Sequence, residues 1–195
     1  MIKAFIFDFF GVIGASTYQL LAENIAINNE NIKNITDLHK AMDNGFISQE
    51  KFLHDYAKFA NLSYPEFLEI YHNSNNRFKV SQKLLAYIAS LRKKGFKIGL
   101  LSNVNEEAYK EFIKPIILEG LFDEVMLSYM VGVAKPEQKI FTLMAERLLL
   151  DPTECLMVDD IALNCEGAMG VGMAAIQYTI FDKFKQDLEQ LLVDN

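Results

Sequence analysis

Carboxylate, hydroxyl and amide side chains follow three short apolar runs of this sequence, at positions from which they could reach a bound ligand. The run "FIF" ends at Asp8, "IGLL" ends at Ser102 and Asn103, and "CLMV" ends at Asp159 and Asp160. If these runs are parallel strands, their carboxyl ends meet at one edge of a sheet, where ligands bind. Carboxylates of this kind hold Mg²⁺, and a hydroxyl can help to position a phosphate. The spacing therefore predicts a site for a metal ion and a phosphate group.

A lysine and a pair of adjacent aspartates strengthen this prediction. Lys135 precedes Pro136, a residue suited to the first turn of a helix, and its ammonium group could pair with a phosphate. Asp159 and Asp160 would repel each other unless a cation or hydrogen-bond donors compensated their charges. Each residue alone has an ordinary structural explanation, as a cap, a helix start or a surface charge. Their order along the chain is what predicts one shared site.

Short apolar runs alternate with helical patterns over most of the chain. Besides the N-terminal run, the predicted strands are residues 96–102, 124–128, 155–159 and 173–178. Each is strand-length and apolar on both faces, as central parallel strands are. The predicted helices are residues 81–95, 105–120, 135–150 and 159–172, with N-caps at Ser81 and Asn105 and C-terminal glycines at Gly95 and Gly120. This alternation predicts an α/β fold with a doubly wound parallel sheet.

Residues 15–79 interrupt the alternation and contain helical patterns but no convincing strand. One of these patterns follows Ser48, a good N-cap for an amphipathic helix. An all-helical insertion directly after the first strand is a candidate for a lid. We therefore expect a core formed by residues 1–14 and 80–195 and a small helical cap formed by residues 15–79. The polar or aromatic candidates for lining the cleft are Tyr18, Asn24, Tyr71 and Asn75.

The composition disfavours several kinds of partner. Nineteen basic and 26 acidic residues give the 195-residue chain a net charge of −7 without a long basic run, which disfavours nucleic acid and anionic membranes. The N-terminal segment carries Asp8 and lacks a small-residue cleavage site, so we expect no signal peptide. No apolar run approaches the length of a membrane span. Cys155 and Cys165 are predicted to be reduced thiols of a cytoplasmic protein. The sequence gives no indication of an oligomeric state.

These segments resemble the motifs of the haloacid dehalogenase (HAD) superfamily, in its phosphatase-like branch, over essentially the whole chain. "FIFDFFGVI" is similar to the first motif of the superfamily, "IGLLSN" to the second and "GVAKPEQKIF" to the third. "CLMVDDIALNCEGAMGVGM" resembles the acidic fourth motif in its two-aspartate form. The helical insertion fits the small cap that many members carry after the first motif.

The resemblance implies a Rossmann-like core, Mg²⁺ as the cofactor and phosphoryl transfer through an aspartyl phosphate. The implied catalytic residues are Asp8 as the nucleophile, Ser102 and Lys135. The implied phosphate-binding residues are Ser102, Asn103 and Lys135. The implied metal ligands are Asp8, Asp160 and the backbone carbonyl of Phe10, with Asp159 and Asn164 as supporting residues. The expected substrate is a small phosphorylated metabolite.

Phe10 departs from the phosphatase pattern, which usually has a second aspartate at that position. That aspartate protonates the leaving group and then deprotonates the attacking water, and such help is worth about 10²–10⁴-fold in rate. Three hypotheses stay open: a Mg²⁺-dependent phosphatase with a reduced first motif, a catalytically silent protein that binds a phosphorylated ligand or a protein, and a metal-free 2-haloacid dehalogenase. The dehalogenases also carry an aromatic residue there. Against this last hypothesis, Asp8, Asp159 and Asp160 would cluster without a cation, and the cap has only Arg77 to clamp a carboxylate.

Overall fold

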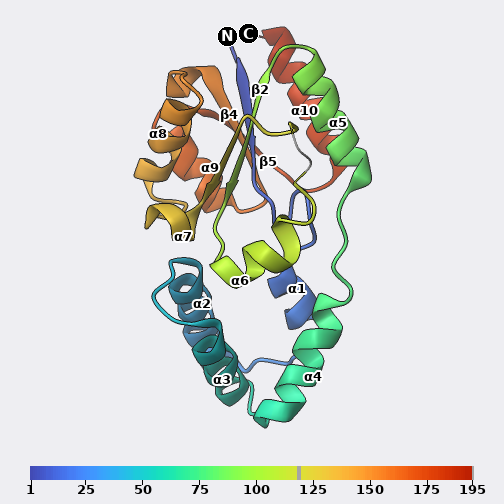
Figure 1. The fold of residues 1–195 in the computed structure, drawn as a ribbon, viewed down its shortest axis with the longest axis vertical. Coiled ribbons are helices and arrows are strands. Elements are labelled where there is room, and N and C mark those ends of the chain that lie inside the picture. Colours follow the sequence, from blue (N-terminus) through green and yellow to red (C-terminus); the bar gives the residue numbers. More distant parts are fainter. Residues whose placement is uncertain (118–119, 195) are drawn as a thin grey trace.

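The chain forms a five-stranded parallel sheet with helices on both faces, in a computed structural model that describes residues 1–117 and 120–194 (Figure 1). The strands are β1 (Ala4–Phe7), β2 (Lys97–Ser102), β3 (Glu124–Leu127), β4 (Cys155–Asp159) and β5 (Ala174–Gln177). Their order is β3-β2-β1-β4-β5, and every pair is parallel. Because the chain winds outward from the central β1 in both directions, the prediction of a doubly wound α/β sheet is confirmed.

The side chains of β1 alternate between two apolar cores, one on each face of the sheet. The flanking helices are α5 (Gln82–Lys93), α8 (Gln138–Arg147), α9 (Ala162–Met169) and α10 (Phe181–Asp194). Phe5 and Phe7 pack in the core that includes α5 and α10, whereas Ala4 and Ile6 pack in the core that includes α8 and α9. A slip of one residue would exchange these two sets of side chains, so burial on both faces fixes the register of β1. The same register fixes the place of Asp8, the next residue.

The predicted helix over residues 105–120 differs most from the structure. Asn105 accepts a hydrogen bond from the Ala108 N–H and starts α6 (Glu106–Ala108), but a π-helical turn, Tyr109–Ile113, follows directly. Pro115 has no N–H to donate and its ring clashes with the carbonyl four residues earlier, so a regular helix cannot continue through it. Residues 118–119, at the end of the predicted helix, lie outside the described residues.

The helix expected from residue 135 begins only at Gln138, so the prediction that Pro136 lies in its first turn is wrong. The Asn103 side chain accepts a hydrogen bond from the Lys135 N–H at 2.9 Å and donates one to the Lys135 carbonyl at 2.8 Å. These two bonds hold the segment in a turn, and the extended residue Glu137 becomes the N-cap. The predicted N-cap at Ser81 and the glycine after α5, Gly95 with a φ of +95°, are confirmed.

Four helices lie between β1 and α5 and share an apolar core of their own. They are α1 (Thr17–Ala22), α2 (Asn29–Asp43), α3 (Gln49–Phe59) and α4 (Tyr64–Asn75), and we refer to them as the cap helices. Each starts with a side-chain cap; their N-caps are Ser16, Asn28, Ser48 and Ser63. Figure 1 shows these helices at the end of the molecule opposite the two termini, beyond the carboxyl ends of the strands.

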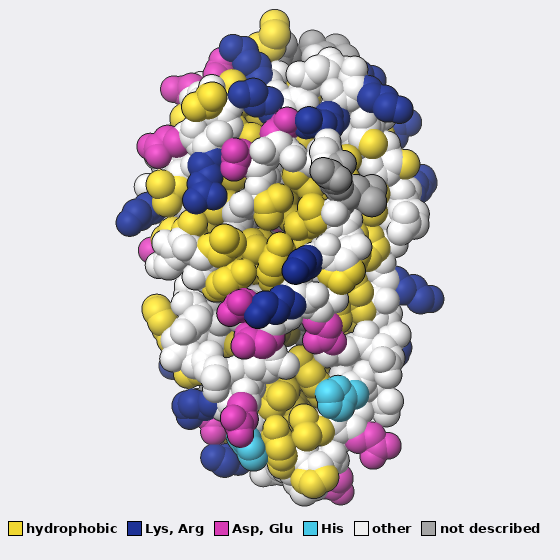
Figure 2. Space-filling view, in the orientation of Figure 1, with side chains coloured by type: hydrophobic (Ala, Val, Ile, Leu, Met, Phe, Trp, Pro, Cys, Tyr) yellow, Lys and Arg dark blue, Asp and Glu magenta, His cyan; other side chains and the backbone are white. Residues whose placement is uncertain are grey.

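The surface carries side chains of both charges, as Figure 2 shows for one face. Two further short segments complete the described structure, helix α7 (Ser128–Val131) and a 3₁₀ turn (Pro152–Glu154). No helix within the described ranges is long and apolar enough to cross a membrane. Cys155 and Cys165 are both buried and unpaired, in agreement with the prediction of free thiols.

Candidate active site

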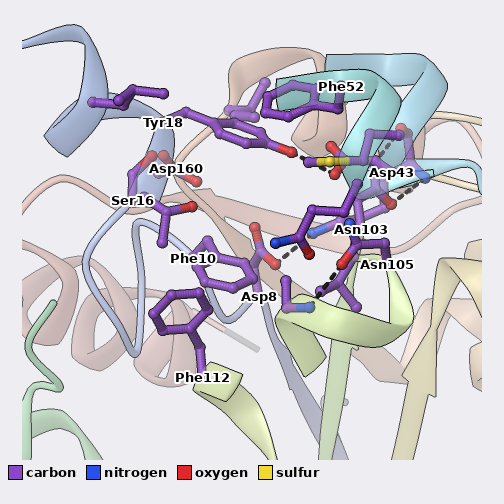
Figure 3. A pocket seen from close by; sticks show the side chains of 18 of the residues that line it. Asp8, Phe10, Ser16, Tyr18, Asp43, Phe52, Asn103, Asn105, Phe112 and Asp160 are labelled. Atoms are coloured by element: carbon purple, nitrogen blue, oxygen red, sulfur yellow. Dashed lines mark hydrogen bonds and ion pairs between the residues drawn. The ribbon is translucent and has the colours of Figure 1, made fainter. Parts of the chain in front are cut away.

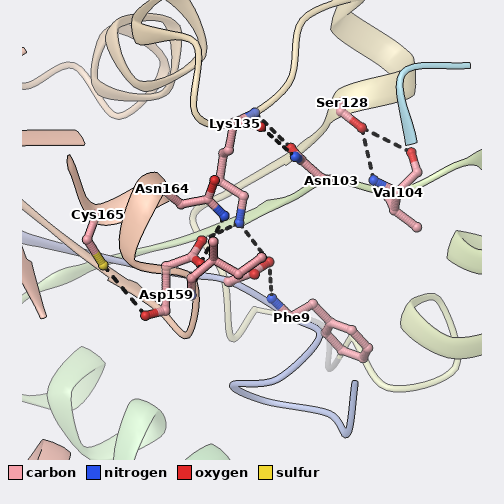
Figure 4. Close-up of polar contacts among 10 residues, drawn as sticks. Phe9, Asn103, Val104, Ser128, Lys135, Asp159, Asn164 and Cys165 are labelled. Carbon is pink, nitrogen blue, oxygen red and sulfur yellow. Dashed lines mark hydrogen bonds and ion pairs between the residues drawn. The ribbon is translucent and has the colours of Figure 1, made fainter. Parts of the chain in front are cut away.

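The ends of β1 and β4 bring two aspartates to one edge of the sheet, with a lysine between them (Figure 4). The N–H of Asp8 donates a hydrogen bond to the Val158 carbonyl at 2.9 Å, which places Asp8 beside Asp159. Lys135 Nζ lies 2.9 Å from Asp8 Oδ1 and 2.6 Å from Asp159 Oδ2. All three side chains are buried, and a buried charge is tolerated only when it is paired, so Lys135 holds the two carboxylates in place.

Asp159 has a partner for each of its carboxylate oxygens. Oδ2 faces Lys135, while Oδ1 accepts hydrogen bonds from the Ile161 N–H at 2.9 Å and from Asn164 Nδ2 at 3.0 Å. Asp8, in contrast, receives the Phe9 N–H at 2.7 Å and the lysine on the same oxygen, Oδ1. Asp159 therefore suits a supporting role, and the second oxygen of Asp8 is left for a ligand.

Asp8, Asp159 and Asp160 form a set of oxygen ligands that fits a hard divalent cation. One carboxylate oxygen from each lies within 4.8 Å of the others. Oδ1 of Asp160 is buried and has no hydrogen-bond partner among the described residues, which is costly unless a ligand satisfies it. Gly11, at φ +84°, passes so close that a Cβ there would lie 2.2 Å from Asp160 Oδ2. Mg²⁺ prefers such carboxylate ligands, and the carbonyl of Phe10 stays a prediction as a further one.

Burial and neighbouring charges together govern the protonation of this cluster. Burial raises the pKa of Asp8, the neighbouring Asp159 and Asp160 add to the rise, and Lys135 opposes it. Burial alone would lower the pKa of Lys135, but the Asp8 and Asp159 carboxylates outweigh it and raise that pKa. Burial also raises the pKa of Asp160 to about 6, with a further contribution from Asp159. A bound divalent cation would offset the same repulsion, which is the electrostatic argument for a metal at this place.

The two polar residues at the end of β2 have different surroundings. Ser102 is fully buried, its hydroxyl has no partner among the described residues, and it is not part of the pocket wall. Asn103 lines the pocket and is engaged with the backbone of Lys135. The phosphate-binding roles of both residues stay predictions, and in this structure Asn103 positions the lysine.

Phe10 forms an aromatic wall beside Asp8. Its ring centroid lies 5.1 Å from that of Phe9, 6.2 Å from that of Phe78 and 6.0 Å from that of Phe112. Figure 3 shows Phe10 and Phe112 on one side of the pocket that contains Asp8. An apolar ring, which cannot transfer a proton, therefore lies beside Asp8 in the pocket wall.

The pocket above Asp8 has an empty volume of about 870 Å³, including its open mouth, and the cap helices supply much of its wall. Two of the four sequence candidates, Tyr18 and Tyr71, line it, whereas Asn24 and Asn75 are not among the lining residues described. Asp43, the last residue of α2, also lines the pocket and was not among the sequence candidates. Its carboxylate accepts a hydrogen bond from the Tyr18 hydroxyl at 2.5 Å. An acidic residue at a helix C-terminus is unfavourable for the helix dipole, but that alone does not place the residue in a site.

Comparison with known sequences agrees with the geometry. Residues 2–172 match the family model described as haloacid dehalogenase-like hydrolase. Over 85 residues the chain is 38% identical to a Mycobacterium tuberculosis protein named phosphatase MT3486, covering 43% of this chain and 39% of that one. Over 100 residues it is 32% identical to glyceraldehyde 3-phosphate phosphatase of Pyrococcus furiosus, covering 51% of this chain and 42% of that one. The matched segments thus span about two fifths of each of these relatives.

Solved structures share the fold at low sequence identity. A HAD-like family hydrolase from Porphyromonas gingivalis has a TM-score of 0.72 and 24% identity over 98% of both chains. A HAD family enzyme from Bacteroides thetaiotaomicron, in complex with magnesium and inorganic phosphate, has a TM-score of 0.66 and 22% identity over 92% of this chain and 95% of that one. Because the family model spans most of the sequence and these structures share its fold, the chain belongs to the haloacid dehalogenase-like hydrolases.

Proposed function

We propose that the protein is a Mg²⁺-dependent phosphatase that hydrolyses a small phosphate monoester through an aspartyl phosphate on Asp8. The observation that carries the proposal is the buried Asp160 oxygen, which has no partner in the described residues and lies in a carboxylate cluster beside Lys135. A cation would satisfy this oxygen, and a phosphate would bring the negative charge that a cation and a lysine attract. The names of the two curated phosphatase relatives point the same way.

The reaction would start with attack of Asp8 on phosphorus. The bond from phosphorus to the leaving oxygen breaks as the bond to the Asp8 carboxylate forms, and water then attacks phosphorus and releases Asp8. Lys135, 2.9 Å from Asp8 Oδ1, would favour the ionised form of the nucleophile and orient it. Bound Mg²⁺ would supply charge neutralisation at the phosphoryl oxygens. Such transfers depend mainly on positioning and on electrostatic stabilisation, which buried and paired groups can provide.

The charges in the pocket argue against a 2-haloacid as the substrate. Lys135 is the single basic residue among the lining residues described, and two carboxylates already bind it. Arg77 lines a separate surface pocket and pairs with Glu23 at 2.8 Å. The carboxylate of a haloacid would therefore find no uncommitted cation in the described part of the wall, next to the nucleophile.

The pocket wall suggests the class of leaving group. Half of its lining side chains are apolar or aromatic, among them Leu21, Met42, Phe52, Val104 and Phe112. We therefore propose a phosphate ester of a small, partly apolar organic group, over which the cap helices of residues 15–79 close.

The proposed function is tested by incubating the purified protein with a panel of phosphate monoesters and with 2-chloropropionate, each with Mg²⁺ and with a chelator. We expect release of phosphate that requires Mg²⁺, and no release of chloride. Chloride release that persists in the chelator would establish dehalogenase activity instead. Absence of turnover across the panel would favour a silent protein that only binds its ligand.

A substitution at the metal cluster gives a separate prediction. Asp160→Ala removes a carboxylate whose buried oxygen has no other described partner, so Mg²⁺ affinity should fall by more than about 10-fold, the lower limit that even outer-shell partners contribute. Titration calorimetry with MgCl₂ measures this change. Asp37→Ala, in the exposed part of α2, is the matched control and should bind Mg²⁺ like the wild type. Equal Mg²⁺ affinities in all three proteins would show that Asp160 is not a ligand of the metal.

A further inference from the structure

The proposed reaction needs a proton for the leaving group, and Phe10 cannot supply it. We propose that Asp43, carried by the cap helices, is the general acid and base of this reaction. The inference rests on the proposed phosphatase function and names the residue that would complete it. Asp43 would take over the proton transfers that a second aspartate in the first motif normally performs.

Few groups in the pocket can exchange a proton near neutral pH. The titratable residues among those described in the wall are Asp8, Tyr18, Asp43, Tyr71, Lys135 and Asp160. Asp8 has the place of the nucleophile, Asp160 belongs to the cation cluster, and Lys135 is held between two carboxylates. Burial raises the pKa of both tyrosines above its usual value of 10, so they hold their protons too tightly. Of the three carboxyl groups in the described wall, Asp43 alone is assigned neither to the nucleophile nor to the cation cluster.

Asp43 faces the pocket with one oxygen available. Tyr18 donates its hydroxyl hydrogen to Oδ1 at 2.5 Å, and no described residue forms a hydrogen bond with Oδ2. Figure 3 shows Asp43 and Tyr18 across the pocket from Phe10 and Phe112. In a phosphoryl transfer the leaving oxygen lies roughly in line with the nucleophile and on the far side of phosphorus. A leaving group opposite Asp8 therefore points from the edge of the sheet toward the cap helices, where Asp43 is placed.

The backbone of Asp43 is tied directly to the core. Its carbonyl accepts a hydrogen bond from Ser128 Oγ at 2.7 Å, and the same hydroxyl accepts one from the Val104 N–H at 2.9 Å. Ser128 is fully buried at the start of α7, and Val104 follows the loop residue Asn103. One serine thus fixes the end of α2 against the loop that also positions Lys135. Ser128 is a positioning residue for Asp43.

The surroundings of Asp43 suit a group that gives and takes protons. Burial raises its pKa to about 7, while the hydrogen bond from Tyr18 and the charge of Lys135 act in the opposite direction. His39, whose ring stacks on Tyr18 at 3.8 Å, is neutral because burial lowers its pKa to about 4. Tyr71 contributes to the raised pKa of Tyr18 and is not among the groups that shift the pKa of Asp43. A pKa near the working pH is what makes a carboxyl group effective in both roles.

Two proton transfers complete the cycle. Protonated Asp43 gives its proton to the leaving oxygen as the bond between that oxygen and phosphorus breaks. At the same time the Asp8 carboxylate forms its bond to phosphorus. The alcohol product then leaves. The Asp43 carboxylate takes a proton from water as the water oxygen bonds to phosphorus, and the bond to Asp8 breaks. Both aspartates return to their starting states, and one water has been consumed.

The inference is tested with one alkyl phosphate and one aryl phosphate at saturating Mg²⁺. Alkoxides need a proton to leave and nitrophenolates do not, so the two esters separate acid catalysis from all other contributions. We expect Asp43→Asn to lower kcat/KM for the alkyl ester by about 10²-fold or more, within the general acid range, and for the aryl ester by less than about 3-fold. Asp37→Asn makes the same chemical change on the exposed part of α2 and should affect neither ester.

The pH dependence gives a readout that a purely structural role would not change. The ratio of alkyl to aryl kcat/KM cancels the titration of Asp8 and of the substrate phosphate. In the wild type this ratio should fall as pH rises through the pKa of Asp43, because the acid loses its proton. In Asp43→Asn it should be low and independent of pH. Tyr18→Phe removes a hydrogen bond that lowers this pKa, so the fall should move to higher pH.

Each outcome separates the role of Asp43 from the proposed function. A wild-type ratio that does not change with pH, or an equal loss of both activities in Asp43→Asn, would overturn the role of Asp43 and leave the phosphatase proposal standing. The wild-type pH profile decides between these outcomes even if the variant does not fold. A wild-type protein that hydrolyses no ester of the panel would overturn the proposed function, and the role of Asp43 with it.

Discussion

Asp8→Asn is expected to abolish the hydrolysis of phosphate esters while the fold stays intact. An amide cannot form the acyl phosphate, and loss of a nucleophile that acts in a catalytic unit costs about 10⁴–10⁶-fold in kcat. Asparagine has nearly the same shape as aspartate and carries no charge. Because burial disfavours the charged form of Asp8, the metal-free variant should have a Tm at neutral pH equal to or above that of the wild type. Release of 4-nitrophenolate and thermal unfolding measure the two effects.

Asp37→Asn, on the exposed part of α2, is the control for this experiment and should keep full activity. The covalent mechanism would be contradicted if purified and folded Asp8→Asn protein still hydrolysed the aryl ester at a substantial fraction of the wild-type rate.

Lys135→Met is expected to destabilise the fold and to remove activity. Lys135 is buried between Asp8 and Asp159, and methionine would leave two buried carboxylates without their cation. Removing one partner of a buried ion pair costs about 3–5 kcal/mol in the free energy of unfolding, a large fraction of the stability of a domain. Urea unfolding without metal measures this loss.

Lys139→Met, an exposed position in α8, controls for the chemical change in the lysine variant and should leave the urea midpoint close to that of the wild type. Mg²⁺ should reduce the loss in Lys135→Met, because a cation that binds the folded cluster restores part of the missing charge. Equal midpoints for the two variants would contradict the assigned role of Lys135.

The core of the site could be predicted because it depends on local sequence. A strand that is apolar on both faces must end where its polar residues begin, and parallel strands end at one edge. Asp8 and Asp159 therefore meet in the structure as their positions in the sequence indicate. The register of β1, fixed by burial on both faces, leaves little freedom for this part of the fold.

The part of the pocket wall that the cap helices supply could not be predicted, because it depends on how these helices pack against the core. Asp43 lies 35 residues from Asp8 in the numbering, and nothing in the local sequence brings the two together. Their relation depends on tertiary bonds such as Ser128 Oγ to the Asp43 carbonyl. The turn at Lys135 also depends on tertiary hydrogen bonds, because the Asn103 side chain binds both backbone groups of Lys135. Long-range hydrogen bonds override local propensity at both places.

In the proposed reaction Asp8 carries the phosphoryl group, and a direct search for that group tests this role. The wild-type protein is mixed with Mg²⁺ and a ³²P-labelled aryl phosphate, quenched in acid within the first turnover, and digested for peptide mapping. We predict label on the peptide that contains Asp8, dependent on Mg²⁺ and absent from Asp8→Asn. Release of labelled phosphate with the label on another residue, or equal labelling of the Asp8→Asn protein, would contradict a covalent role for Asp8.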